Sequence, residues 1–206
     1  DEMALRVGTT RESLSRALKD GITSLIGVPA LWQLLQRRIE THVRDRGDLS
    51  RLVLEGSRAV NAFVREHMGL SVGAVTTYPV HRALGGRLRH LVSGGSALSP
   101  ETARFFRSLG LDLIEGYGLT EAGPVLTVSD PLDADAIGTV GKPLAGVELQ
   151  IDAPDGSGVG EVLARGPNVM LGYWRAEEAT NAVLDQGWLR TGDLGAIDAH
   201  GRLRLV

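Results

Sequence analysis

Five consecutive residues, Tyr117 to Glu121, combine side chains that could contact a nucleotide. They follow Gly116 and the apolar run 111–115, which predicts a short buried strand. Glycine has no Cβ, so it lets the backbone approach a ligand closely. Tyr117 offers an aromatic face for a base, Thr120 a hydroxyl for a phosphate oxygen, and Glu121 a carboxylate for a divalent cation. The spacing predicts a nucleotide site, and a helix or loop cap is the alternative for Thr120 and Glu121.

A second glycine segment, Ser93-Gly94-Gly95-Ser96, follows a predicted strand and precedes a predicted helix. Its N–H groups could cradle a phosphate, or its bare backbone could form a flat wall for a purine. The alternative is a tight strand-to-helix connection, which this segment alone favours. Only its combination with other motifs would make it a binding segment.

A third segment, Thr191-Gly192-Asp193, places a carboxylate directly after a glycine turn. A carboxylate in that position could accept hydrogen bonds from both hydroxyls of a ribose, as acidic residues do in dinucleotide sites. The alternative is a turn with no binding role.

The composition excludes several other chemistries. The chain has no cysteine, which rules out disulfides, thiolate metal sites and a cysteine nucleophile. It has no Gly-x-Ser-x-Gly elbow and no Gly-x-x-x-x-Gly-Lys-[Ser/Thr] loop, and its five histidines lack metal or catalytic spacing. A net charge of −3 gives no case for nucleic acid, and no membrane span or signal peptide is visible. We expect a cytoplasmic location, with peripheral attachment to a membrane left open.

The elements around these segments predict an α/β fold. The strand–helix–strand unit over 88–115 is the βαβ pattern of a parallel sheet. Ligands bind beyond the carboxyl ends of such strands, where Gly94-Gly95 and Gly116-Tyr117-Gly118 both lie. Residues 70–80 show no clear period. Hydrophobic periodicity predicts four helices, over 12–19, 31–39, 49–66 and 100–108, and Pro29 starts the second of them. It predicts strands over 23–28, 88–92 and 111–115.

From about residue 125 the pattern predicts a mostly β region, a small distorted barrel. Short strands are expected at 146–151, 160–164, 193–198 and 202–206, and one helix at 177–184. The charge also changes, since residues 1–110 hold 16 of the 22 Lys and Arg but only 10 of the 25 Asp and Glu. We therefore predict an α/β subdomain over residues 1–124 and a mostly β subdomain over residues 125–206, which carries Asp193.

In their order along the chain, these motifs resemble those of the adenylate-forming superfamily of acyl-CoA synthetases, luciferases and peptide-synthetase adenylation domains. The resemblance covers about residues 20–206, and four motifs in the family's order make it specific. Leu84–Arg89 and Glu115 are similar to the branch of bacterial long-chain fatty acyl-CoA ligases. Departures include Ser96-Ala97, where the family usually has Ala-Pro. The four matching segments are Ser93–Glu101, Glu115–Glu121, Gly160–Trp174 and Trp188–Gly195.

The resemblance implies roles for individual residues. The backbone at Gly94, Gly95 and Ser96 and the ring of Tyr117 would border the adenine of ATP or AMP, while Asp193 would bind the ribose hydroxyls. Thr120 would contact phosphate and Glu121 would hold Mg²⁺, so these two are the predicted catalytic residues. Glu115, Gly116 and Gly118 complete the predicted cofactor-binding set, and Gly94, Gly116 and Gly118 would also line an acyl pocket.

The resemblance also implies a reaction. A fatty acid, of the long-chain class, would attack the α-phosphate of MgATP, and coenzyme A would then displace AMP to form a thioester. Two parts of the family's site are not recognised in this sequence: the upstream phosphate loop and the C-terminal lid domain with its catalytic lysine. The only lysines in the sequence are Lys19 and Lys142. We therefore expect a central slice that is inactive on its own and binds AMP weakly. The acyl chain length and the oligomeric state are not indicated.

Other functions remain as alternatives. An adenylating enzyme could transfer the acyl group to a carrier protein or an amide partner instead of coenzyme A. A non-catalytic nucleotide-binding scaffold segment is a different class, against which the joint retention of Thr120, Glu121 and Asp193 argues. A Rossmann dehydrogenase is disfavoured because no strand leads into a Gly-x-Gly-x-x-Gly turn.

Overall fold

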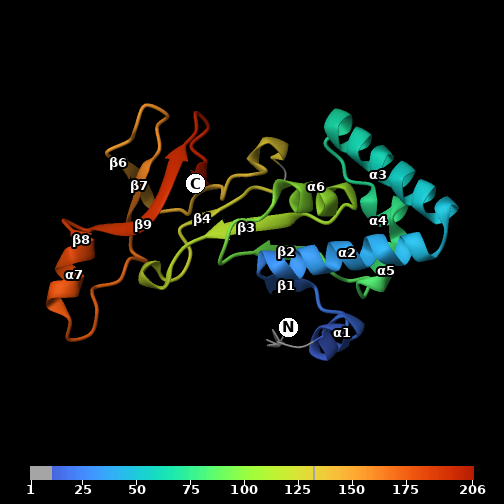
Figure 1. The fold of residues 1–206 in the computed structure, drawn as a ribbon, viewed down its shortest axis with the longest axis horizontal. Coiled ribbons are helices and arrows are strands. Elements are labelled where there is room, and N and C mark those ends of the chain that lie inside the picture. The colour runs from blue at the N-terminus through green and yellow to red at the C-terminus, as the bar shows by residue number, and fades with distance from the viewer. Residues whose placement is uncertain (1–10, 132) are drawn as a thin grey trace. The chain divides into compact units, whose positions relative to one another are not determined.

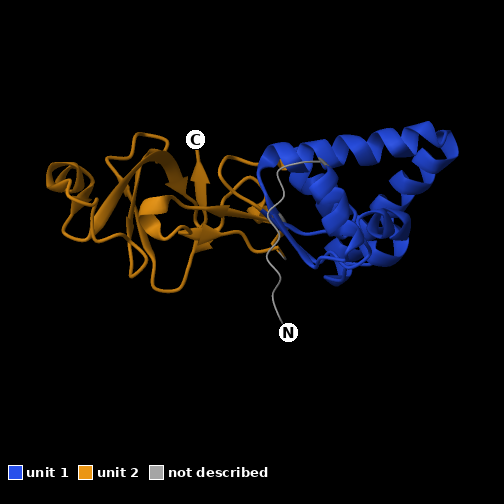
Figure 2. Ribbon diagram, turned by 90° about the horizontal axis from the view of Figure 1, so that it is seen from below, with its two compact units in different colours: residues 1–92, 101–113 blue, residues 93–100, 114–206 orange. Residues whose placement is uncertain are grey.

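The computed structural model describes residues 11–131 and 133–206, which form two compact units (Figure 2). Unit 1 comprises Asp1–Val92 and Glu101–Leu113, and unit 2 comprises Ser93–Pro100 and Ile114–Val206. Every residue predicted to contact the nucleotide lies in unit 2. These units are defined by compactness, and the predicted subdomain division at residue 124 stays a prediction.

The first part of the chain is mostly helical (Figure 1). The strands β1 and β2 are neighbours in one sheet. The predicted helices and strands of this part are all present, and α2 runs on well beyond its predicted apolar face. Residues 70–80 hold two short helices that no period indicated. The elements are α1 (Arg11–Lys19), β1 (Ser24–Gly27), α2 (Pro29–Asp45), α3 (Asp48–Met68), α4 (Gly73–Thr76), α5 (Tyr78–Ala83), β2 (His90–Ser93) and α6 (Pro100–Ser108).

The core of unit 1 packs α2 against α6. Trp32 is fully buried and meets Phe106 edge to face, with ring centroids 5.9 Å apart. On α3 the buried residue is Asn61, whose amide donates to the carbonyl of Ser108 at 3.1 Å and accepts from the N–H of Val72 at 2.8 Å. This polar contact is satisfied on both sides, as burial requires.

The second part of the chain is mostly β, and the fold as a whole is mixed α/β, as predicted. Strands β3, β4 and β5 pair antiparallel, and a second antiparallel sheet has the order β10-β9-β7-β6, with β8 paired to β9. The elements are β3 (Leu113–Tyr117), η1 (Thr120–Ala122), β4 (Thr127–Val128), η2 (Ala134–Ala136), β5 (Lys142–Pro143), β6 (Glu148–Asp152), β7 (Gly160–Arg165), α7 (Glu177–Val183), β8 (Leu184–Asp185), β9 (Trp188–Ile197) and β10 (Leu203–Leu205).

Two strands differ from their predicted bounds. The strand predicted over 111–115 and ending in Gly116 runs on to Tyr117 in β3, where Gly116 and Tyr117 pair with Val128 and Thr127 of β4. A strand predicted from residue 193 begins at Trp188 instead. In both places pairing with a neighbouring strand, β4 for β3 and β8 for β9, extends the ladder beyond the predicted run.

The core of unit 2 contains the first predicted site residue. Tyr117 is only 8% exposed and packs with residues from the turn after it and from both sheets. Burial in this cluster fixes the ring, and the turn that follows Tyr117 starts from a rigid point. The cluster comprises Tyr117, Ala122, Leu126, Val140, Val162, Ala164, Leu189 and Leu203.

Over the described residues, no helix combines the length and apolar character that a membrane crossing needs.

Candidate functional site

Thr120 and Glu121 lie on a short 3₁₀ turn directly after β3. The chain doubles back there, and the N–H of Leu126 donates to the carbonyl of Tyr117 at 2.8 Å. This reversal brings backbone against Gly118, where a Cβ would meet the carbonyl oxygen of Pro124 at 2.1 Å. Glycine at this position is therefore required by main-chain packing, and its Cβ side holds no room for an acyl chain.

The two residues predicted to contact adenine and ribose touch each other. The hydroxyl of Tyr117 donates to Oδ2 of Asp193 at 2.7 Å, across 76 positions of sequence. Burial raises the pKa of the Tyr117 phenol, and the neighbouring Asp193 carboxylate raises it further. The phenol therefore stays protonated and remains a donor. Because a carboxylate offers about four acceptor positions, Asp193 can still accept from other hydroxyls.

A β-bulge in β9 places Asp193 at this position. Glu161 and Leu163 of β7 pair with Leu194 and Arg190 of β9. One residue lies between the two on β7, whereas three lie between their partners on β9: Thr191, Gly192 and Asp193. The extra residues leave the ladder, Gly192 takes a φ of +75°, and the hydroxyl of Thr191 donates to the carbonyl of Val162 at 2.8 Å. Bulges re-aim side chains in this way beside functional sites. The predicted glycine turn is thus part of a strand.

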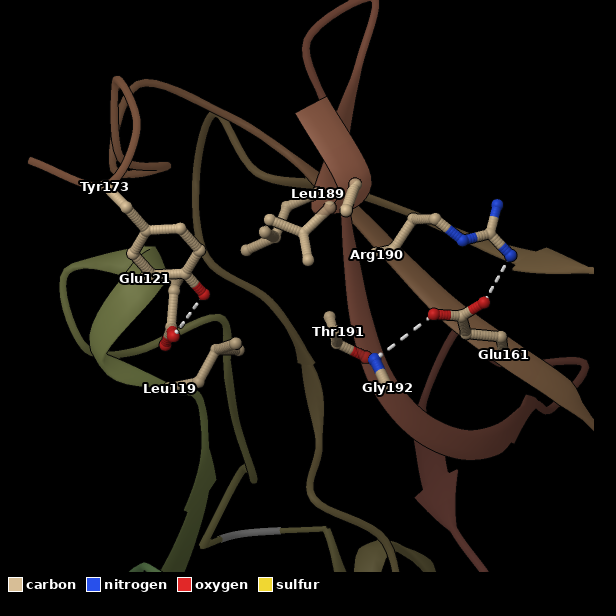
Figure 3. A pocket seen from close by; sticks show the side chains of 10 residues that line it. Leu119, Glu121, Glu161, Tyr173, Leu189, Arg190, Thr191 and Gly192 are labelled. Atoms are coloured by element: carbon tan, nitrogen blue, oxygen red, sulfur yellow. Dashed lines mark hydrogen bonds and ion pairs between the residues drawn. The ribbon is translucent and has the colours of Figure 1, made fainter. Parts of the chain in front are cut away.

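Glu121 lines a pocket of about 240 Å³ within unit 2 (Figure 3). One of its oxygens, Oε1, accepts a hydrogen bond of 2.8 Å from the hydroxyl of Tyr173. Figure 3 shows these two side chains on one side of the pocket, with Thr191 and Gly192 of the bulge on another. The Glu121 hydrogen bond raises the pKa of Tyr173, and partial burial adds to that shift.

The bulge side of the pocket is held by a charged cluster. Arg190 pairs with Glu161 and, at 2.8 Å, with Oδ2 of Asp152. The second oxygen of Glu161 accepts from the N–H of Gly192 at 3.2 Å (Figure 3). Glu161 therefore binds the residues on both sides of Thr191, next to Asp193.

Glu115 of β3 bonds to the connection that follows the segment Gly94-Gly95-Ser96. The Glu115 carboxylate is 7% exposed, and its Oε1 accepts from the N–H of Leu98 at 2.8 Å. Burial raises the pKa of Glu115, while that N–H lowers it in part. The predicted nucleotide contact of Glu115 stays a prediction, and its carboxylate contacts the backbone of Leu98, two residues after Ser96.

Gly94 and Gly116 are less tightly enclosed than Gly118. A Cβ on Gly94 would come within 3.7 Å of the carbonyl oxygen of Gly116, and a Cβ on Gly116 within 3.6 Å of the carbonyl oxygen of Thr127. Both are ordinary contact distances. A methyl group would therefore fit at these two glycines but not at Gly118.

Sequence reasoning missed four residues of this site. Asn168 and Tyr173 belong to the segment Gly160–Trp174, which matched a family motif but received no role. Glu161 and Arg190 likewise lie inside matched motifs. Their presence there was the only signal, since their partners are 29 to 52 positions away.

The donor set around Glu121 fits Mg²⁺ bound together with a nucleotide. Among the described residues, no group of three or more His, Cys, Asp or Glu could form a metal cage. Mg²⁺ commonly keeps several waters and binds one or two carboxylates plus substrate phosphates. Glu121, half-buried beside a pocket, with the exposed Thr120 next to it, meets that requirement. The assignment of Mg²⁺ to Glu121 remains a prediction.

Comparison with known proteins decides the family. Residues 6–174 match the family described as AMP-binding enzyme. This chain belongs to the AMP-binding enzyme family. The match contains the glycine segment and the Thr120–Glu121 turn.

Individual relatives agree with this assignment. The long-chain-fatty-acid–CoA ligase FadD15 of Mycobacterium bovis is 47% identical over 124 residues, which are 60% of this chain and 20% of that protein. Long-chain-fatty-acid–CoA ligase 2 of Schizosaccharomyces pombe is 35% identical over 198 residues, 89% of this chain and 29% of that protein. This chain thus spans less than a third of the length of either relative.

Among solved structures, a malonyl-CoA ligase in a ternary product complex with methylmalonyl-CoA and AMP has a TM-score of 0.64 and 31% identity. The alignment covers 96% of this chain and 36% of that one. The fold is therefore shared over nearly the whole of the present chain.

Proposed function

We propose that unit 2 forms the nucleotide-binding wall of an ATP-dependent long-chain fatty acyl-CoA ligase. The observation that carries this proposal is the hydrogen bond between Tyr117 and Asp193. It joins the residue assigned to adenine with the residue assigned to ribose, which are far apart in sequence. The names of the relatives in the previous subsection support the ligase class.

In this function, each predicted residue has a defined task. Adenine is bordered by Tyr117 and by the backbone of Gly94, Gly95 and Ser96. Asp193 accepts hydrogen bonds from the ribose hydroxyls. Thr120 contacts a phosphate oxygen. Glu121 would hold Mg²⁺, which neutralises charge on the phosphates when bound.

The chemistry proceeds in two displacements. A carboxylate oxygen of the fatty acid forms a bond to the α-phosphorus of ATP, and pyrophosphate leaves. The thiol sulfur of coenzyme A then attacks the acyl carbonyl carbon, its proton is lost, and AMP leaves. This chain's own contribution is positioning and electrostatic complementarity, which dominate phosphoryl-type transfer.

The surroundings of Gly94 and Gly116, where a Cβ would meet no atom closer than 3.6 Å, are the proposed entry of the acyl chain. Gly118 is omitted from this lining because main chain fills its Cβ side. The long-chain class of the fatty acid and coenzyme A as the acceptor are proposals that rest on the names of the relatives, and a cytoplasmic location is a proposal from the sequence.

Binding of AMP to the 206-residue chain tests the nucleotide assignment. We expect saturable, weak binding by calorimetry that Asp193→Ala lowers about tenfold, the loss typical of hydrogen bonds made by a charged group. Binding that Asp193→Ala leaves unchanged would contradict the ribose contact.

Fatty-acid-dependent exchange of pyrophosphate into ATP tests the reaction in the whole protein that contains this chain. Glu121→Ala should reduce that exchange at least about a hundredfold, as removal of transition-state charge stabilisation does. Near-normal exchange would remove Glu121 from the mechanism. The 206-residue chain alone should give no measurable exchange.

A further inference from the structure

The turn that carries Thr120 and Glu121 is weakly held by its own backbone. Its internal hydrogen bonds run from the N–H of Ala122 to the carbonyl of Leu119 at 2.9 Å and from the N–H of Gly123 to the carbonyl of Thr120 at 3.4 Å. A single 3₁₀ turn has poor hydrogen-bond geometry. A carboxylate that must meet a cation needs additional support to keep its orientation.

The segment after β7 contacts the backbone of this turn. The side-chain amide of Asn168 donates to the carbonyl of Ala122 at 2.8 Å and to the carbonyl of Val125 at 2.9 Å. The N–H of Met170 donates to the carbonyl of Glu121 at 2.8 Å. Two carbonyls of the turn and one shortly after it are therefore fixed by residues more than forty positions away.

Tyr173 contacts the functional group itself. Its hydroxyl donates to Oε1 of Glu121 and so restricts rotation of the carboxylate (Figure 3). The second carboxylate oxygen, Oε2, can still bind a cation. A tyrosine phenol is protonated at neutral pH, so this donor persists there.

Tyr173 is in turn held by α7. Its N–H donates to the hydroxyl oxygen of Thr180 at 2.9 Å, and the Thr180 hydroxyl donates to the carbonyl of Ala176 at 2.9 Å. Gly172 lies so close that a Cβ there would meet the Thr180 Cγ2 atom at 2.8 Å. Because the Tyr173 residue is 38% exposed, these bonds place it more than packing does.

We propose that Asn168 and Tyr173 are positioning residues of the adenylation site. Asn168 holds the backbone of the Thr120–Ala122 turn, and Tyr173 orients the Glu121 carboxylate toward the cation of MgATP. This inference rests on the proposed function, because Glu121 needs a fixed orientation only if it binds a cation. It adds two residues that act through the turn and through the Glu121 carboxylate.

The role of Tyr173 is tested by nucleotide binding to the 206-residue chain. A fluorescent ATP analogue with Mg²⁺ and AMP without Mg²⁺ are titrated against the wild type and Tyr173→Phe. Tyr78→Phe, which alters an exposed tyrosine of unit 1, is the matched control. We expect Tyr173→Phe to weaken MgATP-analogue binding about tenfold and to change AMP binding by less than about twofold.

A merely structural role of Tyr173 would lower both affinities together. Wild-type affinity of Tyr173→Phe for the MgATP analogue would overturn its role while leaving the proposed function intact. If the wild type binds neither nucleotide, the proposed function fails, and the role of Tyr173 fails with it.

The role of Asn168 is tested without any ligand. Amide hydrogen exchange is followed at Ala122, Gly123 and Met170, with the amides of β9 as an internal reference for unit 2. Asn168→Ala should accelerate exchange at these three amides about tenfold relative to β9, since local opening sets their protection. Tyr173→Phe should leave them unchanged, because its hydroxyl touches only the carboxylate. Unchanged exchange in Asn168→Ala would overturn the inference for the turn, whatever the nucleotide titrations show.

Discussion

The same substitution at two neighbouring glycines should have opposite effects. A Cβ on Gly118 would stand 2.1 Å from the carbonyl oxygen of Pro124 and 2.7 Å from the Cα atom of Val125. Both atoms are main chain, and the carbonyl of Val125 is bonded to Asn168, so the turn cannot yield cheaply. A Cβ on Gly116 meets nothing closer than 3.6 Å. Neither glycine has a positive φ, which leaves packing as the difference between them.

The magnitudes follow from this geometry. Overpacking against rigid neighbours costs about 1–3 kcal/mol, and we expect Gly118→Ala to lie at the upper end because backbone must move. Gly116→Ala should be neutral or stabilise unit 2 by up to about 1 kcal/mol, since alanine reduces the entropy of the unfolded chain. At 1.4 kcal/mol per factor of ten, Gly118→Ala should accelerate global hydrogen exchange about a hundredfold.

Native-state hydrogen exchange of the β7 and β9 amides measures this free energy, since these central strands open only when unit 2 unfolds. AMP affinity is measured on the same samples. Gly116→Ala should keep its protection and lose about tenfold in AMP affinity, because Gly116 belongs to the predicted cofactor-binding set and a methyl group there would crowd the nucleotide. If Gly118→Ala proved as stable as Gly116→Ala, the tight reversal at Pro124 would be refuted.

Two further predictions concern charged groups. Burial raises the pKa of Glu115 above its ordinary value of 4.5, so the folded state binds more protons there than the unfolded state does. The free energy of unfolding of unit 2 should therefore fall as pH rises from about 4.5 toward the folded pKa. In Glu115→Gln, which keeps an oxygen for the N–H of Leu98, urea unfolding should lose that pH dependence, and an unchanged slope would contradict the assignment. Glu161→Ala should weaken AMP binding about fivefold because it releases the bulge. Glu148→Ala breaks a comparable exposed pair with Arg165 and should leave AMP binding unchanged. Each variant should lower the free energy of unfolding by less than about 1 kcal/mol. Equal affinity losses in the two variants would contradict a specific role for Glu161.

The elements that sequence predicted are those whose information is local. The apolar spacing of Leu31, Leu34, Leu35 and Ile39 and the proline at position 29 lie within α2 itself, and the structure confirms that helix. The strands β6 and β7 are likewise continuous runs bounded by turn residues. Each pattern is complete within one segment, so no knowledge of a partner is needed.

The elements that sequence did not predict depend on distant partners. The strands β4 and β5 are two residues long and exist because each pairs with a neighbour. Helix α5 follows Thr77, whose hydroxyl donates to the carbonyl of Leu109 at 2.9 Å, a contact across 32 positions. Such segments have no period of their own, and a pattern search along the chain cannot detect them.

The site shows the same distinction. The types of Tyr117, Glu121 and Asp193 and their order predicted the ligand, since chemistry is a property of the side chain. That Tyr117 donates to Asp193 could not be predicted, because this contact requires both the buried ring and the bulge in β9. The motifs indicated which residues act, and the fold determines which of them meet.

Both functional arms of this site are irregular backbone: a 3₁₀ turn carries Glu121 and a β-bulge carries Asp193. Irregular backbone leaves ladder groups without their regular partners, and these must be satisfied in another way. Asn168 satisfies the carbonyls of Ala122 and Val125 on the turn, while Glu161 accepts the N–H of Gly192 in the bulge. Neither residue belongs to the irregular segment that it binds. Substitutions at such residues should therefore disturb ligand binding more than global stability, because they release a local geometry and leave the hydrophobic core of unit 2 untouched.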